Sequence, residues 1–365
     1  MDNQRFCVIM AGGYGNHFWP MSREDRPKQF LIGLTKDGKS LTRSAYEQCL
    51  EVVPKENILV VTLDKFAHFV RDQIPEIGEE NLLLEPYGRK TGPCIVYSIY
   101  KILKRCPDAV AAFIPADIVI PDSEQFRSTV SSALDYAQEH KVLLSIGIRP
   151  KSPSPNYGYL QVAGGRLDAA SKKPVKVKTF VEKPSKELAE IFCKSGEFLW
   201  NSGIFVWKAS VIKEEMEKCM PEITSMFTGW EGAFGTSAER ELLEKAYADC
   251  FKISIDNGVM ERTDKAWVFL ANFDWYDIDN WTTLCNYVNE KDRDGNIVRV
   301  GKEYLSSNKD SIIASSSRNK LVAVKGLKDY IVIDTPDVLL ICPRDDSEYK
   351  NFLGDLLLPG YEDYK

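Results

Sequence analysis

The sequence lacks several features that define large classes of protein. Across 365 residues no apolar run reaches the roughly 20 residues that a membrane-spanning helix needs. The first five residues lack the apolar core of a signal peptide. Histidine is scarce, at three residues, and the three do not form a pattern of metal ligands. These absences predict a cytoplasmic protein that does not span a membrane.

A surplus of basic residues is also absent. The chain has 47 Lys and Arg against 53 Asp and Glu, a net charge of −6, so it has no general attraction for nucleic acid or anionic membranes. Its nine cysteines are scattered from Cys7 to Cys342 without a Cys-x-x-Cys pair. This pattern indicates reduced core thiols rather than a disulfide framework or a zinc site. Any phosphate site must therefore be a local basic pocket.

Apolar runs alternate with helical patterns in the first 150 residues. The candidate strands are 6–10, 57–62, 81–84, 109–114 and 142–148, and the candidate helices are 42–53, 64–72, 91–105 and 123–139. This rhythm predicts an α/β domain with a doubly wound, mainly parallel sheet. Ligands of such sheets bind beyond the carboxyl ends of the strands. Segments 12–28, 85–93 and 115–117 all follow candidate strands in that position.

The pattern changes toward the C-terminus. Candidate strands at 157–162, 175–182 and 198–207 mix with candidate helices at 185–194, 210–218 and 239–248, and a further helix is predicted at 253–260 with Ser254 as its N-cap. A charged link at 289–295 precedes short β-rich runs at 296–300, 311–314, 321–324, 330–334 and 338–342. We therefore expect one domain at 1–287 and a small β-solenoid-like domain at 288–365.

The richest local signal is the loop after the first candidate strand. It runs Ala11-Gly12-Gly13-Tyr14-Gly15, and a lysine and two arginines follow within one loop length. Glycines let backbone amides approach a ligand, and amides with a lysine suit phosphate oxygens. No Gly-Lys-Ser/Thr ends the loop, so it is not a P-loop, and Pro20 and Pro27 oppose the helix of a dinucleotide fingerprint. A nucleoside triphosphate is the first ligand to consider.

The whole stretch resembles a family signature. Ala-Gly-Gly-x-Gly, Phe-Trp-Pro-x-Ser-Arg and Pro-Lys-Gln-Phe follow one another over residues 11–30, in the form found in sugar-1-phosphate nucleotidyltransferases and above all in their mannose-1-phosphate guanylyltransferase branch. Residues 321–342 resemble the β-helical C-terminal region of the same branch. The resemblance implies a Rossmann-like fold and transfer of GMP from GTP to mannose 1-phosphate, with Mg²⁺ as cofactor and GDP-mannose and pyrophosphate as products.

The resemblance also implies roles for residues on the nucleotide side. Lys28 and Asp117 would be catalytic, and Asp117 and Asp277 would bind the metal, with Asp274 and Asp279 as competing carboxylates near Asp277. The nucleotide would contact Ala11, Gly12, Gly13, Gly15, His17, Arg23, Glu85, Gly88, Arg89 and Thr91. A carboxylate can accept hydrogen bonds from guanine N1–H and N2–H₂, a pairing that adenine does not offer. Glu85 and the backbone groups of segment 85–93 are the alternative candidates for this contact.

On the sugar-phosphate side the resemblance implies four residues. Glu182 would hold sugar hydroxyls, Lys183 the sugar phosphate, and Asn201 and the Gly158 backbone would complete the hydroxyl contacts. A homodimer formed through the C-terminal β region is a family-level expectation. The substrates are the expected partners, without nucleic acid or membrane.

Four residues depart from the family pattern. His17 stands where the family has an arginine that clamps the triphosphate, and a neutral imidazole offers one donor where guanidinium offers five. Lys90, Ile118 and Asp279 replace the usual Asn, His and Gly. Lys90 and Arg23 are candidates to compensate for His17.

Three alternatives stay open from the sequence. The first is an enzyme of the same kind that uses another nucleotide or another sugar phosphate, because hydroxyl stereochemistry cannot be read from the sequence. A non-catalytic paralogue that binds nucleotide sugars would also keep Glu182 and Lys183. A structural or scaffolding protein is disfavoured, because it has no reason to keep both phosphate lysines and the aspartates.

Overall fold

Strand β1 (Arg5–Met10) shows why the first apolar runs form a covered sheet. Phe6 and Val8 belong to one buried cluster with residues of the helix at 91–105, while Cys7 and Ile9 are also buried but lie outside that cluster. Successive side chains of a strand point to opposite faces, so both faces of β1 are covered. The computed structural model describes residues 4–15, 18–35, 37–165, 173–288, 291–344, 349–355 and 360–364.

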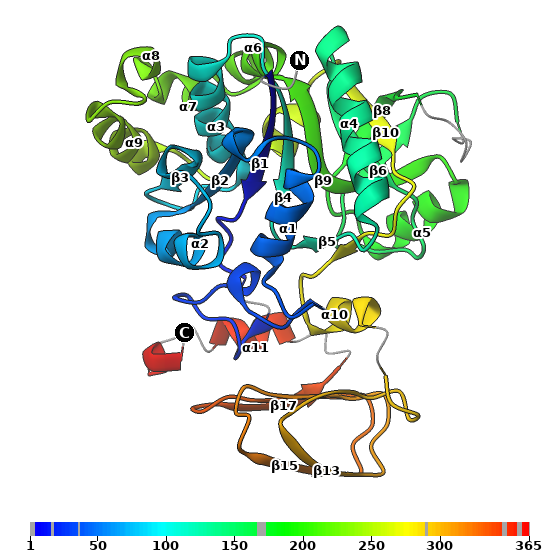
Figure 1. The fold of residues 1–365 in the computed structure, drawn as a ribbon. Helices are drawn as coiled ribbons and strands as arrows, with labels where there is room; N and C mark the ends of the chain where they lie inside the picture. Colours follow the sequence, from blue (N-terminus) through cyan, green and yellow to red (C-terminus); the bar gives the residue numbers. More distant parts are fainter. Residues whose placement is uncertain are drawn as a thin grey trace. The chain divides into compact units, whose positions relative to one another are not determined.

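Among the described residues, nine strands form the main sheet in the order β3-β2-β1-β4-β9-β6-β10-β8-β7 (Figure 1). The others are β2 (Ile58–Leu63), β3 (Leu82–Glu85), β4 (Val110–Pro115), β6 (Leu143–Ile148), β7 (Tyr159–Val162), β8 (Val175–Val181), β9 (Phe198–Lys208) and β10 (Ala266–Leu270). The pairings make β8 and β9 run against the rest. The predicted mainly parallel, doubly wound sheet is confirmed, with two reversed strands.

Helices lie over this sheet. Helix α4 (Ser123–Glu139) packs against β4, β6 and β9 (Figure 1). The side chain of Asp122 caps its first turn by accepting from the Gln125 backbone amide at 2.9 Å. The α-helices described between residues 41 and 249 are α1 (Leu41–Leu50), α2 (Ala67–Gln73), α3 (Thr91–Arg105), α4 (Ser123–Glu139), α5 (Lys186–Ser195), α6 (Ala209–Cys219), α7 (Pro221–Met226), α8 (Trp230–Ala233) and α9 (Ala238–Asp249).

The predicted helix at 253–260 is shorter and of another type. Residues Asp256–Met260 form a π-helical turn, and Ser254 accepts a hydrogen bond from the Asn257 amide at 3.3 Å. The start of the segment is held at the first residue of α3, because the Ile255 backbone amide donates to the Thr91 hydroxyl at 2.9 Å. Tertiary contacts therefore override the local helical pattern here.

The C-terminal strands stack as coils of a β-helix. Among the described residues, β12 (Ile297–Arg299), β14 (Ile312–Ser315) and β16 (Tyr330–Asp334) form parallel pairs, and β17 (Leu339–Pro343) adds an antiparallel edge. Strands β13 (Lys302–Ser306) and β15 (Leu321–Lys325) form a second parallel layer (Figure 1). The predicted β-solenoid-like architecture is confirmed. The tail carries α11 (Tyr349–Asp355) and a 3₁₀ turn at Glu362–Tyr364.

The chain divides into two compact units that are discontinuous in sequence. Unit 1 comprises Met1–Gly12, Thr42–Ala116 and Ile120–Trp275, and unit 2 comprises Gly13–Leu41, Asp117–Val119 and Tyr276–Lys365. The two predicted domains, 1–287 and 288–365, are linear segments and stay a prediction. The glycine-rich loop from Gly13 onward thus belongs to the same unit as the β-helix.

Unit 2 has its own apolar core. Phe18 and Leu41 share it with Ile278 and Trp281 and with inward-facing residues of the β-helix such as Ile333. Helix α10 (Trp281–Tyr287) starts with a reciprocal cap between Asn280 and Thr283. The same core therefore supports the loop after Gly13 and the strands after residue 297.

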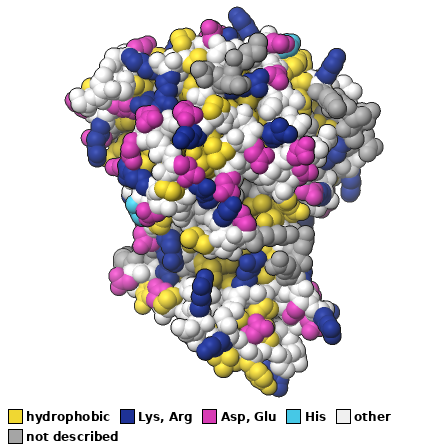
Figure 2. All heavy atoms as spheres, viewed as in Figure 1, with side chains coloured by type: hydrophobic (Ala, Val, Ile, Leu, Met, Phe, Trp, Pro, Cys, Tyr) yellow, Lys and Arg dark blue, Asp and Glu magenta, His cyan; other side chains and the backbone are white. Residues whose placement is uncertain are grey.

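Two further observations concern the surface. Basic and acidic side chains are interspersed over the face shown in Figure 2, rather than gathered by sign. In the parts of the chain that the structure describes, no helix combines the length and apolarity needed to cross a bilayer.

Candidate active site

The glycine-rich loop folds back onto the segment that carries Lys28. Gly15 has a φ of +63°, and a Cβ there would lie 2.5 Å from Cγ of Lys28, so only glycine fits. The Ser22 hydroxyl donates to the Gly15 carbonyl at 2.7 Å, and the Gln29 amide donates to the Gly13 carbonyl at the same distance. These contacts bring the loop and the lysine together, as the sequence predicts for a phosphate site.

Lys28 is a buried ammonium surrounded by acceptors. Lys28 is the first residue of the 3₁₀ turn Lys28–Phe30 and is only 5% exposed. The Nζ atom donates to the Ile278 carbonyl at 2.8 Å and lies 3.1 Å from Asp117 Oδ2. Burial opposes the charged form, but the nearby carboxylates of Asp117, Asp277 and Asp279 outweigh it and raise the pKa of Lys28 above its ordinary value. Lys28 is therefore cationic at neutral pH.

A short antiparallel pair brings the carboxylates together. Strand β5 (Ile118–Val119) pairs with β11 (Tyr276–Asp277), with Ile118 opposite Asp277. The Ile278 amide donates to the Asp117 carbonyl at 3.1 Å. Residues far apart in the sequence thereby face the same lysine.

Of the competing carboxylates, one joins this group and one does not. Asp279 Oδ1 lies 3.6 Å from Lys28 Nζ, whereas Asp274 forms an ion pair with Lys151 in unit 1. Asp279 is therefore a residue of the Lys28 group, here called the lysine–carboxylate cluster (Lys28, Asp117, Asp277, Asp279). Asp279, which stands where the resemblance leads us to expect a glycine, places an extra negative charge beside the lysine.

The donor set of this cluster suits magnesium. Mg²⁺ prefers carboxylate oxygens and usually takes only one or two of them together with phosphate oxygens and water. Asp117 is 38% exposed and so accessible to such a ligand. Within the described residues no three His, Cys, Asp or Glu side chains form a ready metal site. The metal role of Asp117 and Asp277 stays a prediction.

In unit 1, Gly12 and Glu85 lie against each other. A Cβ on Gly12 would lie 2.9 Å from Glu85 Oε2, and Glu85 Oε1 accepts from the Tyr247 hydroxyl at 2.9 Å. Burial raises the pKa of Glu85 to about 8, with the Tyr247 hydrogen bond acting in the opposite direction. The Ala11 amide is already engaged, because it donates to the Val61 carbonyl at 2.8 Å. Glu85 thus holds a proton at neutral pH in this structure.

We expect Glu85 to make stability depend on pH. Its pKa in the folded state, about 8, lies above the ordinary value of 4.5, so the folded protein keeps a proton that the unfolded chain loses. The stability that this proton contributes to the folded state is fully present below about pH 4.5 and is lost progressively as the pH rises toward 8. Relative to Glu85→Gln, the free energy of unfolding of the wild type should fall by up to about 2–3 kcal/mol between about pH 5.5 and about pH 7.5.

Urea unfolding at the two pH values measures this difference. Glu51→Gln, which alters an exposed carboxylate, is the matched control and should track the wild type. A constant offset between Glu85→Gln and the wild type at both pH values would contradict the prediction.

The segment after Glu85 makes contacts within the protein. Arg89 donates from Nε to the Tyr247 carbonyl at 2.9 Å and from Nη2 to the Ala248 carbonyl at 3.1 Å. Thr91 accepts from the Ile255 amide, and Gly88 is half-buried. Lys90 is exposed and adopts a φ of +66°. Arg89 therefore holds the end of α9 in this structure, and its predicted nucleotide contact stays a prediction.

Two other predicted nucleotide residues have different outcomes. His17 lies outside the described residues. Arg23 is 9% exposed and donates to the carbonyls of Pro20 and Tyr364 and to the Asp337 carboxylate. Its guanidinium is therefore occupied within unit 2.

The predicted sugar-side residues lie together in unit 1. The backbone amide of Asn201 donates to the Gly158 carbonyl at 2.8 Å. Gly158 also lies close to Glu182, because a Cβ on Gly158 would be 2.7 Å from Glu182 Oε2. Burial raises the pKa of Glu182, with Lys183 acting against this rise. Lys183 is exposed and has a φ of +47°. The arrangement places hydroxyl acceptors beside an accessible ammonium.

Sequence reasoning missed Asp256 as a member of this group. Its Oδ1 accepts from the Asn201 side-chain amide at 3.0 Å. Burial, followed by the charge of Glu182, raises the pKa of Asp256 to about 7. The only signal was an acidic residue near the start of the predicted 253–260 helix, which is also a common helix-start feature.

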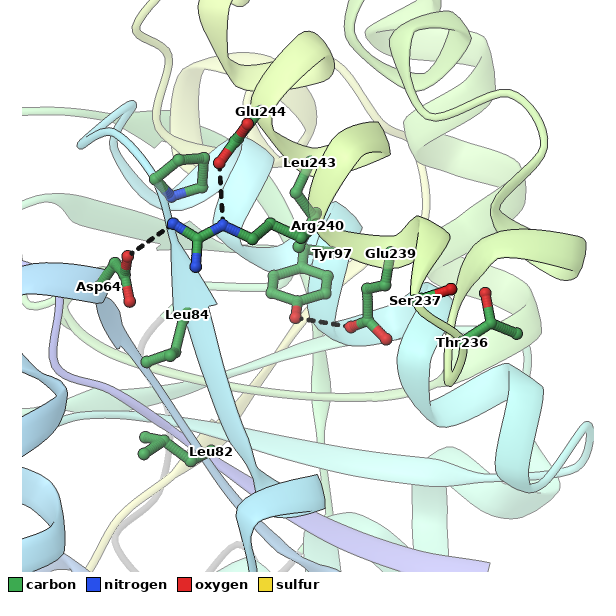
Figure 3. Close-up of a pocket in the computed structure, with 11 residues that line it drawn as sticks. Asp64, Leu82, Leu84, Tyr97, Thr236, Ser237, Glu239, Arg240, Leu243 and Glu244 are labelled. Atoms are coloured by element: carbon green, nitrogen blue, oxygen red, sulfur yellow. Dashed lines mark hydrogen bonds and ion pairs between the residues drawn. The ribbon is translucent and has the colours of Figure 1, made fainter.

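A separate cavity of about 350 Å³ lies beside the edge strand β3 (Figure 3). Its charged lining is paired internally: Arg240 contacts Glu244 at 2.9 Å and Asp64 at 3.5 Å, and the Tyr97 hydroxyl donates to Glu239. None of the predicted site residues lines it. The functional assignment therefore rests on the clusters described above.

Comparison with known proteins identifies the family of the chain. The family described as nucleotidyl transferase matches residues 6–293, and the family described as MannoseP isomerase/GMP-like beta-helix domain matches residues 306–349. The first match covers most of the chain and includes every predicted site residue.

Individual relatives span nearly the whole chain. Mannose-1-phosphate guanylyltransferase 2 of Escherichia coli O157:H7 is 33% identical over 98% of this chain and 74% of its own length. The mannose-1-phosphate guanylyltransferase of Klebsiella pneumoniae is 31% identical over 93% of this chain and 71% of its own. A crystal structure from Thermus thermophilus, named as a mannose-1-phosphate geranyltransferase, has a TM-score of 0.81 at 30% identity and covers 97% of this chain and 99% of its own. The chain therefore belongs to the nucleotidyl transferase family, among the mannose-1-phosphate guanylyltransferases.

Proposed function

We propose that this protein transfers GMP from GTP to mannose 1-phosphate. An oxygen of the sugar phosphate forms a bond to the α-phosphorus of GTP. The bond between that phosphorus and the oxygen leading to the β-phosphate breaks, and pyrophosphate leaves with the electron pair. The products are GDP-mannose and pyrophosphate. The observation that carries this proposal is the buried Lys28 ammonium among Asp117, Asp277 and Asp279, in a chain whose relatives are mannose-1-phosphate guanylyltransferases.

The lysine–carboxylate cluster suits the triphosphate side of this reaction. The attacking phosphate oxygen is already ionised, so the reaction needs charge stabilisation and positioning more than a general base. Lys28 supplies a preorganised positive charge for the phosphate oxygens and the leaving pyrophosphate. When bound, Mg²⁺ held by Asp117 and Asp277 would neutralise charge on the phosphates. Asp279 would orient the lysine, because it lies 3.6 Å from Nζ.

We assign the sugar phosphate to Gly158, Glu182, Lys183 and Asn201. The carboxylate of Glu182 and the side-chain amide of Asn201 are groups of the kind that bind sugar hydroxyls, and the exposed Lys183 ammonium suits the phosphate. Glu85 is assigned to the guanine base: contact with guanine N1–H and N2–H₂ would favour its carboxylate form and so release its proton.

We also propose a cytoplasmic location and keep a homodimer as the expected assembly. Among the described residues the cysteines form no disulfide, which fits a reducing compartment.

Pyrophosphate release tests the activity and its alternatives. The full chain is incubated with Mg²⁺ and each of the four common nucleoside triphosphates, with mannose 1-phosphate or glucose 1-phosphate. Release with GTP and mannose 1-phosphate alone is the expected result. Release with another pair would keep the chemistry and replace the substrates.

Glu182→Gln is the matched variant for the sugar side. It should weaken mannose 1-phosphate binding and leave GTP binding unchanged. Wild-type protein that binds GDP-mannose but releases no pyrophosphate from any pair would contradict the enzyme proposal and favour a non-catalytic binding paralogue.

A further inference from the structure

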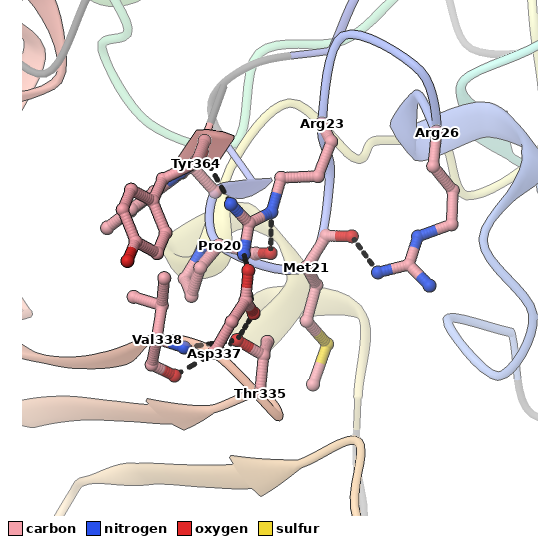
Figure 4. A network of polar contacts seen from close by, with 9 residues as sticks. Pro20, Met21, Arg23, Arg26, Thr335, Asp337, Val338 and Tyr364 are labelled. Atoms are coloured by element: carbon pink, nitrogen blue, oxygen red, sulfur yellow. Dashed lines mark hydrogen bonds and ion pairs between the residues drawn. The ribbon is translucent and has the colours of Figure 1, made fainter. Parts of the chain in front are cut away.

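Arg23 is held by the C-terminal part of unit 2, as Figure 4 shows. Its Nη2 atom donates to both oxygens of Asp337, at 3.0 and 3.1 Å, and its Nη1 atom donates to the Tyr364 carbonyl. The Nε atom donates to the Pro20 carbonyl at 2.8 Å. All three guanidinium nitrogens are thus used, and the side chain is 9% exposed. The guanidinium of Arg23 is therefore engaged by protein groups, and its role in this structure is to hold the chain in place rather than to bind a phosphate.

Asp337 is itself fixed for this contact. It lies in the turn between β16 and β17, where the Thr335 hydroxyl donates to its Oδ1 at 2.8 Å (Figure 4). Partial burial raises its pKa, but the Thr335 hydrogen bond and the charge of Arg23 outweigh burial, so the pKa of Asp337 lies below its ordinary value. Asp337 therefore stays ionised at neutral pH and offers Arg23 a permanent charge.

The tail reinforces the same attachment. The Tyr364 carbonyl also accepts from the Trp19 indole N–H at 2.7 Å. In turn, the Trp19 carbonyl accepts from the Tyr349 hydroxyl at 3.0 Å and from the Trp281 indole at 3.2 Å. Segment 19–23 is thus bound by polar groups from α10, α11 and the final turn of the chain.

From Arg23 the contacts continue to the glycine-rich loop and Lys28. The neighbouring Ser22 donates to the Gly15 carbonyl at 2.7 Å. The backbones of Arg23 and Arg26 exchange two hydrogen bonds, at 3.0 and 3.1 Å, and close the turn that leads into Lys28. Arg26 donates to the Met21 carbonyl, which stabilises the same turn (Figure 4). A displacement of Arg23 would therefore move the loop and the lysine together.

We propose that Arg23 is a positioning residue. Asp337 and the terminal turn (Glu362–Tyr364) hold its side chain, and Arg23 in turn fixes the position of the glycine-rich loop. The inference rests on the proposed function, since it presumes that GTP binds this loop. It replaces direct nucleotide contact by Arg23 with an indirect effect. It also gives the β-helix a role in the reaction: a residue more than 300 positions from the loop controls the affinity for GTP.

The test compares Asp337→Asn with wild type in the full chain. Asparagine keeps the size and the Thr335 hydrogen bond but removes the charge that holds Arg23. We expect the Kd for GTP, measured by calorimetry, and the KM for GTP to rise about 2- to 30-fold, while the KM for mannose 1-phosphate stays unchanged. Lys320→Gln is the control, because it breaks the 2.6 Å pair with Asp334 elsewhere in the β-helix. It should leave both constants unchanged.

Arg23→Lys and the double variant separate positioning from direct contact. Because Arg23 and Asp337 act as a unit, Asp337→Asn should have little further effect once Arg23 is lysine. If Arg23→Lys weakens GTP binding while Asp337→Asn does not, Arg23 contacts the nucleotide itself and the proposal is overturned. Equal rises in both substrate constants would show a general structural role and would also overturn it.

Failure of the proposed enzyme function can be distinguished from failure of the inference about Arg23. A wild-type chain that binds GTP without releasing pyrophosphate contradicts the enzyme proposal, yet the calorimetric comparison of Asp337→Asn still decides the inference. A wild-type chain that binds no GTP overturns both.

Discussion

Replacing Lys28 by glutamine is expected to lower kcat about 100- to 1,000-fold, with a smaller change in the KM for mannose 1-phosphate. The side chain is nearly fully buried, so its charge acts in a poorly screened environment. The three nearby carboxylates hold it in the ammonium form and the Ile278 carbonyl fixes its direction. Glutamine has similar reach but carries no charge to stabilise the leaving pyrophosphate.

Initial-rate measurement with both substrates varied gives the two constants. Lys302→Gln, which removes an exposed lysine of β13, is the control and should retain wild-type rates. Thermal unfolding of each variant identifies misfolding, because removing Lys28 leaves three neighbouring carboxylates without their counter-charge. A folded Lys28→Gln protein with wild-type kcat would show that Lys28 has no catalytic role.

Asp117→Asn and Asp277→Asn should each lower kcat/KM at least about 100-fold and raise the Mg²⁺ concentration needed for half-maximal rate about 10- to 100-fold. Both carboxylates face Lys28 through the pairing of β5 with β11. An amide presents one neutral oxygen where a carboxylate presents two that share a negative charge, so the variant is a poorer ligand for Mg²⁺. Chelation by EDTA should abolish the wild-type rate.

Asp274→Asn is the matched control for this pair. It removes a carboxylate only three residues from Asp277 that pairs with Lys151 instead of Lys28. Rate and Mg²⁺ dependence should remain within about twofold of wild type, as for a surface substitution. A Mg²⁺ requirement in Asp274→Asn that matches the shift in Asp277→Asn would contradict the assignment of the metal ligands.

Much of the fold was predictable because local patterns and tertiary burial agree. The continuous apolar run of β1 and the capped helix α4 both appear in the structure near their predicted bounds. The β-helix was also predicted, from short apolar runs separated by turns. Its β13 strand was missed, because Lys302 and Glu303 face solvent and leave no apolar run to detect.

The candidate site was predictable where a motif is continuous in the sequence. Gly15 and Lys28 lie within one loop length, and the structure brings them into contact. Asp256 was not predictable, because its carboxylate joins Asn201 only after the π-helical turn and β9 pack together. The same limit applied to Asp279 and Asp274, which could not be told apart from the sequence. In the structure Asp279 lies beside Lys28 and Asp274 lies beside Lys151.

By itself, the sequence determined the α/β class, the glycine-rich loop and the family signature, because each depends on residues near one another along the chain. Only the tertiary structure decided which carboxylates face Lys28, and that Arg23 is bound by Asp337 and the terminal turn. The physical reason is that an arginine or aspartate has the same local pattern whether it faces a ligand or the protein. Its partner is chosen by the long-range packing that brings distant carbonyls and carboxylates within hydrogen-bonding distance.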